Sequence, residues 1–145
     1  MHDAYQLERF VQAQDAGGTY RQAVAELRRG RKISHWMWFV FPQIAGLGRS
    51  ATAQRYAISS VEEARAYLAH NILGPRLIEV ATVVAGVTGR SAEGIFGPID
   101  AVKLHSSMTL FAAVDPDEPL YRRVLDAYFD GQFDRATMGL ISTEG

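Results

Sequence analysis

Apolar residues recur every three or four positions along most of this chain, which is the spacing of one face of an α-helix. Around residues 19–28 the apolar positions are Tyr20, Ala23, Val24 and Leu27. Thr19 is suited to cap the start of this helix, and Gly30 stands where helices commonly end in a left-handed residue. Arg28 and Arg29 lie in the last turn, where cations favour the helix dipole. The pattern therefore predicts a helix over about residues 19–28.

The same spacing predicts further helices, separated by residues typical of helix ends. Ser50 and Ser60 are suited to be N-caps, and Glu63 completes a capping box with Ser60. The other predicted stretches are about 7–14, 50–56, 61–68, 75–84, 91–97, 99–113 and 120–129, with a last turn after Asp134. Residues 75–84 have a wide apolar arc, so we expect this helix to be the central buried one.

The aromatic run over residues 36–41 fits either a strand or a short helix, because it is short and does not alternate. The triplet Phe-Val-Phe at residues 39–41 favours a strand, whereas Ser34 as an N-cap favours a helix; Pro42 ends either element. Because nothing else in the chain supplies a partner strand, we interpret the run as a short helix. The predicted fold class is all-α, a compact multihelical single domain over residues 1–145.

Composition and charge narrow the class of protein. A length of 145 residues fits one domain, and 48% apolar residues are ample for a core that buries roughly 70% of the unfolded surface. The net charge of −1, with mixed signs, argues against a nucleic-acid partner. The chain has no cysteine, which excludes disulfides and thiol catalysis. Without a membrane-length apolar run or a signal-peptide pattern, we expect a cytoplasmic protein with no membrane partner and leave its oligomeric state open.

The first candidate site lies in residues 31–48, which we call the Trp-rich segment because it holds both tryptophans of the chain. The faces of Trp36 and Trp38 are suited to stack a planar ring. His35 is a candidate general base, since an imidazole titrates near neutral pH. The segment also offers cations and an amide to an anionic or polar ligand, namely Arg31, Lys32 and Gln43. The alternative is that the tryptophans belong to the core and His35 bonds a backbone carbonyl.

The second candidate site lies on the predicted helix 99–113. Its residues that carry chemistry are Asp100, Lys103, Ser106, Ser107 and Thr109. On a helix, Asp100, Lys103 and Ser107 share one face, and a lysine beside a serine and an aspartate suits the binding of phosphate or carboxylate. Asp100 is a candidate acid or base. The alternative is a surface Asp–Lys pair worth about 0.3–0.5 kcal/mol, with hydroxyls bonded back to the helix.

Other features give weaker signals. The glycine loop over residues 46–48 precedes Arg49 and Ser50; such a loop can hold one phosphate, but we interpret it as a plain loop with an N-cap. The histidines outside the Trp-rich segment have no ligands at metal-binding spacing, so neither a metal nor a cofactor is predicted. These histidines are His2, His70 and His105. The glutamates on apparent solvent faces are expected to have no role: Glu8, Glu26, Glu62, Glu63 and Glu79.

Several ordered motifs of the chain resemble those of a known family. In the Trp-rich segment they are Ser34-His35-Trp36-Met37-Trp38-Phe39, Phe41-Pro42-Gln43 and Gly46-Leu47-Gly48. Beyond it they are Tyr56-Ala57-Ile58, Glu63-Ala64, Tyr67-Leu68, Leu73-Gly74, Phe96-Gly97 and Ser106-Ser107-Met108-Thr109-Leu110-Phe111. Together these motifs resemble the domain of unknown function 1810 family over nearly the whole chain. The resemblance implies a mainly helical fold, and it implies neither a reaction nor a catalytic residue.

Two functional hypotheses follow from these patterns. In the first, the Trp-rich segment and helix 99–113 form a cleft for a planar, anionic, nucleotide-like small molecule, with His35 and Asp100 as acid–base candidates. In the second, the Trp-rich segment is a partly exposed anchor of a protein-interaction module, because tryptophans often dominate interfaces. The residues do not decide whether the protein is an enzyme.

Overall fold

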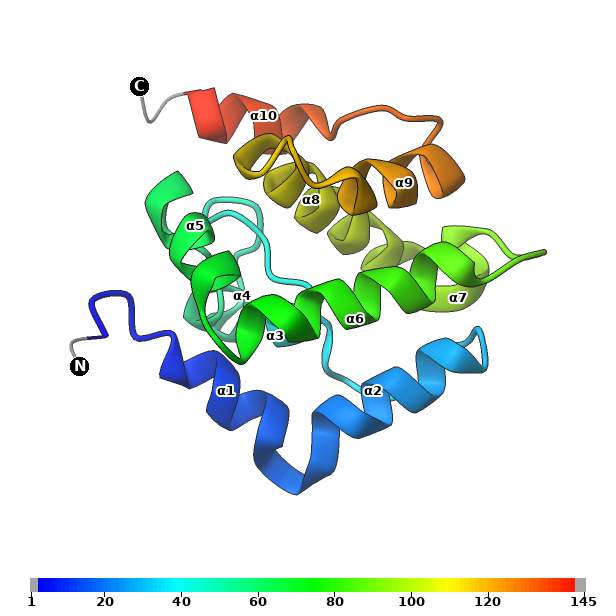
Figure 1. Ribbon diagram of the computed structural model, residues 1–145, viewed down its shortest axis with the longest axis horizontal. Helices are drawn as coiled ribbons and strands as arrows, with labels where there is room; N and C mark the ends of the chain where they lie inside the picture. The colour runs from blue at the N-terminus through cyan, green and yellow to red at the C-terminus, as the bar shows by residue number, and fades with distance from the viewer. Residues whose placement is uncertain (1–2, 143–145) are drawn as a thin grey trace.

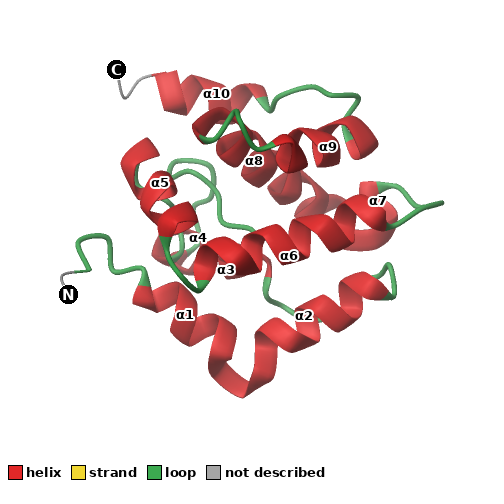
Figure 2. Ribbon diagram, viewed as in Figure 1, coloured by secondary structure: helices red, strands yellow, loops and turns green. Residues whose placement is uncertain are grey.

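The computed structural model describes residues 3–142, and every element in that range is helical (Figure 1 and Figure 2). The elements are α1 (Glu8–Asp15), the 3₁₀ turn η1 (Ala16–Gly18), α2 (Thr19–Arg28), α3 (Met37–Val40), α4 (Ala51–Arg55), α5 (Val61–Ala69), α6 (Leu73–Gly86), α7 (Ala92–Phe96), α8 (Pro98–Val114), α9 (Pro119–Tyr128) and α10 (Arg135–Ser142). Within residues 3–142, extended pairing is limited to an isolated parallel bridge between Ile44 and Ile58. The all-α prediction is therefore confirmed, and the aromatic run contains the short helix α3.

Helix α6 crosses the middle of the molecule, with α1 and α2 on one side and α8, α9 and α10 on the other (Figure 1). It packs against α2, α5 and α9, while α8 packs against α5, α7, α9 and α10. The buried apolar side chains of these helices form one core, so the described residues make a single compact domain. In this described part of the chain, no helix combines the length and the apolar character needed to cross a bilayer.

Helix α8 is buried on all sides in its second half, since every residue in 106–112 is buried. Helix α6 instead buries one face and exposes Glu79 and Thr82. Residues 75–84 thus lie in the helix at the centre of the fold, as predicted, but this helix is buried on one face alone, and α8 is the more completely buried of the two. The hydroxyl side chains of α8 concealed its burial in the sequence, because serine and threonine usually indicate a solvated face.

Some helix ends follow the sequence signals and others do not. Ser34 does not cap α3, whose N-cap position is Trp36, and α6 begins at Leu73 rather than at about residue 75. The hydroxyls of Ser50 and Ser60 each accept a hydrogen bond from the third backbone N–H of the following helix, as predicted. Gly30 ends α2 in the left-handed region, with a φ of 76°. Thr19 is the first residue of α2 rather than its cap, because the left-handed Gly18 occupies the cap position. The predicted cap of this helix is thus wrong by one residue.

Glu63 is buried, contrary to the expectation of a solvent-exposed glutamate without a role. Its carboxylate pairs with Arg9 at 2.9 Å and accepts hydrogen bonds from the backbone N–H and the hydroxyl of Ser59. Arg9 also donates to the carbonyl oxygens of Arg55 and Ala57. The pair therefore ties α1 to the chain between α4 and α5.

Gly74 lets the first turn of α6 pass close to the end of α5. A Cβ atom at this position would lie 2.2 Å from the carbonyl oxygen of Leu68. That oxygen is a backbone atom and cannot rotate away, so any side chain here forces the two helices apart.

We predict that Gly74→Ala lowers the free energy of unfolding by about 1–3 kcal/mol, the usual cost of overpacking. Gly86→Ala, at the other end of the same helix, is the matched control, because a Cβ there meets no atom within 4 Å. It should leave stability unchanged or raise it by up to about 1 kcal/mol. Urea denaturation of both variants measures the difference, and equal stabilities would contradict the close approach at Gly74.

Candidate ligand-binding site

The buried carboxylate of Glu26 holds the start of the Trp-rich segment against α2. Its Oε1 accepts hydrogen bonds from the backbone N–H groups of Ile33 and Ser34 and from the indole N–H of Trp36, at 2.8–2.9 Å. Its Oε2 accepts the Ser34 hydroxyl at 2.6 Å and the Gln22 amide at 3.1 Å. The prediction that Glu26 lies on a solvent face without a role is therefore wrong.

These hydrogen bonds also set the charge of the Glu26 carboxyl group. Burial by itself raises its pKa, but the bonds from Ser34, Ile33 and Trp36 favour the ionised form and lower the pKa of Glu26 to about 2. Glu26 is therefore a carboxylate at neutral pH, and its negative charge is met by donors from the segment that it holds.

Asp100 joins the Trp-rich segment to α8. One of its carboxylate oxygens pairs with the Nζ of Lys32 at 2.8 Å, and the other pairs with the Nζ of Lys103 at 3.2 Å. Burial raises the pKa of Asp100, but the ammonium groups of Lys32 and then Lys103 outweigh it and keep the pKa below its ordinary value. The structure thus brings together three residues predicted for the site, and this cluster carries one positive charge in excess.

The two tryptophans differ in exposure. The side chain of Trp36 is fully buried, its indole N–H is bonded to Glu26, and the Nζ of Lys32 lies 5.0 Å from its ring centre. Trp38, in α3, is half-buried, and the Nζ of Lys103 lies 4.4 Å from its ring centre. Of the two rings, that of Trp38 is therefore the one that a ligand can reach without moving the core.

A pocket of about 450 Å³ lies beside this cluster, between the Trp-rich segment, α8 and the start of α10, and we call it the α8 pocket. Its walls include Gln43, Leu47, Ile99, Val102, Lys103 and Asp134. Ile99 and Val102 are one helical turn apart on α8, and their exposed fractions are 73% and 62%. A smaller pocket of about 110 Å³ shares Gln43 with it and has Trp38 in its wall. The polar groups of the α8 pocket are thus set in a mainly apolar surface.

Gln43 is placed by backbone hydrogen bonds. Its carbonyl oxygen accepts the N–H of Ile58 at 2.8 Å, and the N–H of Ala45 donates to the carbonyl oxygen of Ile58 at 2.8 Å. The half-buried side-chain amide of Gln43 borders both pockets and makes no hydrogen bond within residues 3–142. An amide presents a donor and an acceptor, so Gln43 can bond a ligand without losing an internal partner.

The three hydroxyl residues predicted on α8 are all buried, with different surroundings. Ser106 lines the α8 pocket, and the single proton of its hydroxyl has two acceptors within reach, the carbonyl oxygen of Val102 at 3.1 Å and the carboxylate of Asp134 at 3.3 Å. The Thr109 hydroxyl accepts the N–H of Asp134 at 2.9 Å. The Ser107 hydroxyl has no hydrogen-bond partner among the described residues. Ser106 therefore borders the pocket, whereas Ser107 and Thr109 lie in the core.

His35 and Arg31 are exposed, and their side chains make no hydrogen bond or ion pair within the described range. No such contact joins either of them to Asp100 or to the lysines beside it. Their assignment to the site stays a prediction from the sequence.

The remaining histidines have backbone partners where the structure describes them. The Nδ1 of His70 accepts the N–H groups of Ile72 and Leu73, and the Nε2 of His105 lies 2.7 Å from a backbone carbonyl oxygen. His2 lies outside the described residues. In residues 3–142, no three side chains of the types that bind metals converge on one point.

Several residues that line the α8 pocket are not predicted from the sequence. Asp134 was expected only to cap a turn, and it does accept the N–H of Thr137 at 3.1 Å at the start of α10. Ile99 and Val102 do have a signal in the sequence. They are large apolar residues three positions apart, beside polar residues on the outer side of a helix, and an exposed apolar pair of this kind often marks a binding surface.

Comparison with known proteins finds close relatives of the chain and no function. The family model described as "Protein of unknown function (DUF1810)" matches residues 4–141. A solved structure, that of the conserved hypothetical protein Rv1873 from Mycobacterium tuberculosis, is 54% identical in sequence. The match covers 97% of this chain and 99% of that chain, with a TM-score of 0.93. No curated protein matches the chain.

Glu26 generates a prediction about stability at acid pH. Its pKa is about 2 in the folded chain and 4.5 in its ordinary state, so the unfolded chain takes up the proton first. The stability that the carboxylate contributes is complete above about pH 4.5 and is lost as the pH falls toward 2. We predict that Glu26→Gln lowers the free energy of unfolding by about 2–4 kcal/mol at neutral pH. As the pH falls, the free energy of unfolding of this variant should then decrease less than that of the parent.

Chemical denaturation at several pH values between about 6 and 3 measures both the loss of stability and the change in its pH dependence. Glu62→Gln is the matched control, because Glu62 is exposed on α5 and its side chain makes no hydrogen bond within residues 3–142. This variant should change stability by less than about 0.5 kcal/mol and keep the acid dependence of the parent. If Glu26→Gln showed the same acid dependence as the parent, the assigned charge state of Glu26 would be wrong.

Proposed function

The chain belongs to DUF1810, a family of proteins of unknown function, and we propose that it binds a small planar anionic molecule in the α8 pocket. The proposal rests on one observation: the lining of this mainly apolar pocket includes the unpaired side-chain amide of Gln43 and the ammonium group of Lys103. Its volume of about 450 Å³ lies in the range of small-molecule sites. The proposal is one of binding and assigns no reaction.

The apolar side chains that line the pocket favour a ligand whose main part is a flat ring. Ile99 and Val102 expose most of their side chains, and Leu47 from the loop lies in the same wall. A ring that covers these side chains removes apolar surface from water, which contributes about 25 cal/mol per Å² buried. The amide of Gln43 then bonds a polar atom at the edge of the ring and sets its orientation.

The charge balance supports an acidic group on the ligand. Lys103 shares the carboxylate of Asp100 with Lys32, so two ammonium groups are met by one anion. An acidic ligand group at Lys103 completes this balance. Asp134 also borders the pocket as a second acid, held by hydrogen bonds from hydroxyl groups of α8 and α10, so the excess positive charge belongs to the cluster of Lys32, Lys103 and Asp100 and not to the pocket as a whole.

The protein-interaction alternative has less support. Trp36 is fully buried and Trp38 is half-buried beside Lys103, so neither ring stands out as an exposed anchor. The acid–base roles of His35 and Asp100 stay predictions, as does a cytoplasmic location. Within the proposal, Asp100 holds the lysines in place as a carboxylate.

We predict that a thermal-shift screen with aromatic carboxylates and nucleotides finds a ligand that stabilises the protein. At a hundred times its Kd, such a ligand adds about 2.7 kcal/mol to the free energy of unfolding. For a domain of this size the melting temperature then rises by about 5–10 °C. Lys103→Met keeps the aliphatic stem and removes the charge, so it should abolish the shift caused by an anionic ligand.

Two exposed isoleucines supply a matched pair of controls. Ile99 lines the α8 pocket and is 73% exposed, whereas Ile33 is 66% exposed and does not line it. Ile99→Ser should weaken binding of the ligand, and Ile33→Ser should leave it unchanged. A thermal shift that survives both Lys103→Met and Ile99→Ser would show that the ligand binds elsewhere.

A further inference from the structure

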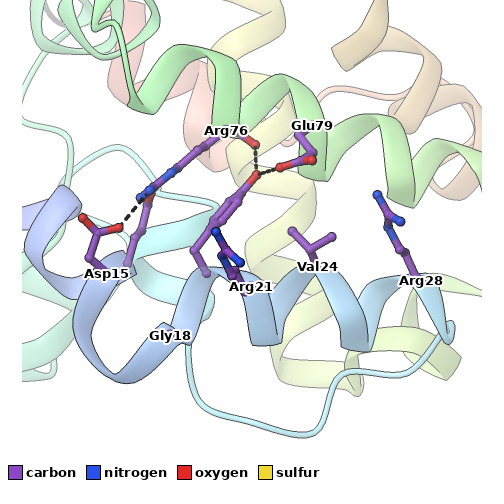
Figure 3. A pocket seen from close by; sticks show the side chains of 9 residues that line it. Asp15, Gly18, Arg21, Val24, Arg28, Arg76 and Glu79 are labelled. Atoms are coloured by element: carbon purple, nitrogen blue, oxygen red, sulfur yellow. Dashed lines mark hydrogen bonds and ion pairs between the residues drawn. The ribbon is translucent and has the colours of Figure 1, made fainter.

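A second concave surface lies between α2 and α6 and shares no residue with the α8 pocket. It is a groove of about 680 Å³ whose walls include Asp15, Arg21, Val24, Arg28, Arg76 and Glu79, and we call it the arginine groove. Figure 3 shows Arg21 and Arg28 rising from α2 toward α6, with Val24 between them. Three guanidinium groups therefore border one groove.

Arg21 and Arg28 have no side-chain partner among the residues that the structure describes. Both are exposed, and their side chains make no hydrogen bond or ion pair within residues 3–142. They are seven residues apart, so they lie on the same face of α2 and about 10 Å apart along its axis. At this separation salt screens most of their mutual repulsion, so what favours an anionic occupant is the unoccupied N–H donors of the two guanidinium groups.

Arg76 is held in place by the protein. It pairs with Asp15 at 2.8 Å (Figure 3). It also donates to the side-chain oxygen of Gln14 at 3.1 Å and lies 4.8 Å from the ring centre of Tyr20. A guanidinium has five N–H donors, so these contacts orient Arg76 and leave donors for a ligand. Because the side chain of Arg76 is already ordered, it loses less conformational entropy when a ligand binds.

The groove has more positive than negative charge. Its acids are Asp15, which is paired with Arg76, and Glu79, which accepts the Tyr20 hydroxyl. Three arginines against two acids leave one positive charge in excess. A neighbouring groove shares Arg28 and adds Arg29 and Arg90 without an acid, which raises the excess to three in a chain whose net charge is −1.

We infer that the arginine groove binds a small molecule with more than one phosphoryl group. Guanidinium groups form paired, charge-assisted hydrogen bonds with phosphoryl oxygens, and Arg21 and Arg28 have these donors unoccupied. Linked phosphates carry more oxygens along a chain, so they can form separate paired bonds to both arginines, whereas a single phosphate must divide its few oxygens between them.

A nucleic-acid strand fits the groove less well than a small polyanion. Strand binding uses exposed aromatic rings as stacking platforms, and the only ring in the described walls, that of Tyr20, is buried and covered by Arg76. The carboxylates of Asp15 and Glu79 would also repel a continuous phosphate backbone. The groove volume is that of a small-molecule site.

Isothermal titration calorimetry of the full chain with inorganic tripolyphosphate and with orthophosphate tests the inference. Tripolyphosphate should bind at least about tenfold more tightly, because it contacts both arginines. The double variant Arg21→Gln, Arg28→Gln should lose about tenfold or more of that affinity. Both residues are exposed, so the fold should be kept, and a thermal melt checks this.

The control is Arg65→Gln, Arg123→Gln, which removes the same charge from exposed positions on α5 and α9. It should change the affinity by less than about twofold, because long-range electrostatic effects are screened by salt. Absence of tripolyphosphate binding, or equal losses in the two double variants, would overturn the inference. A single-stranded oligonucleotide that binds more tightly than tripolyphosphate and is lost in the groove variant would overturn it in favour of a nucleic-acid partner.

Discussion

One buried carboxylate organises the part of the molecule where polar chemistry gathers. Glu26 accepts hydrogen bonds from two backbone N–H groups, a hydroxyl, an indole and an amide. A buried charge without such partners is costly, and the donors without it would be unsatisfied as well. All but one of these donors belong to residues 33–36. The carboxylate therefore fixes a loop that has no regular secondary structure to satisfy its backbone.

This loop is tied to the end of α7 and to the start of α8. The backbone N–H of Lys32 donates to the carbonyl oxygen of Ile95 in α7 at 2.7 Å, and its ammonium reaches Asp100 in the first turn of α8. A carboxylate in a first turn is favoured by the helix dipole, and here it also anchors Lys103. The α8 pocket lies at this junction, so its shape depends on Glu26 through Lys32 and Asp100.

The sequence predicted local structure better than it predicted the burial of charges. A cap such as Ser50 acts on a backbone N–H only three residues away, so its effect can be inferred from neighbours. Glu26 is satisfied by a loop seven to ten residues further on, whose path is set by the packing of Trp36 in the core. In the sequence Glu26 therefore looked like a surface residue. Lys32 and Asp100 were both assigned to a site, but their pairing depends on how the Trp-rich segment meets α8.

Helix α2 shows why charge alone does not identify a binding site. Its buried face carries Glu26, whose acceptor capacity is taken up by internal donors, and its exposed face carries Arg21 and Arg28, whose donors are not. A charge with internal partners stabilises one conformation and has little left to offer a ligand. Lys103 is intermediate, because it shares Asp100 with a second lysine. By this criterion, anion recognition is expected at the arginine groove and the α8 pocket rather than in the aromatic core around Trp36.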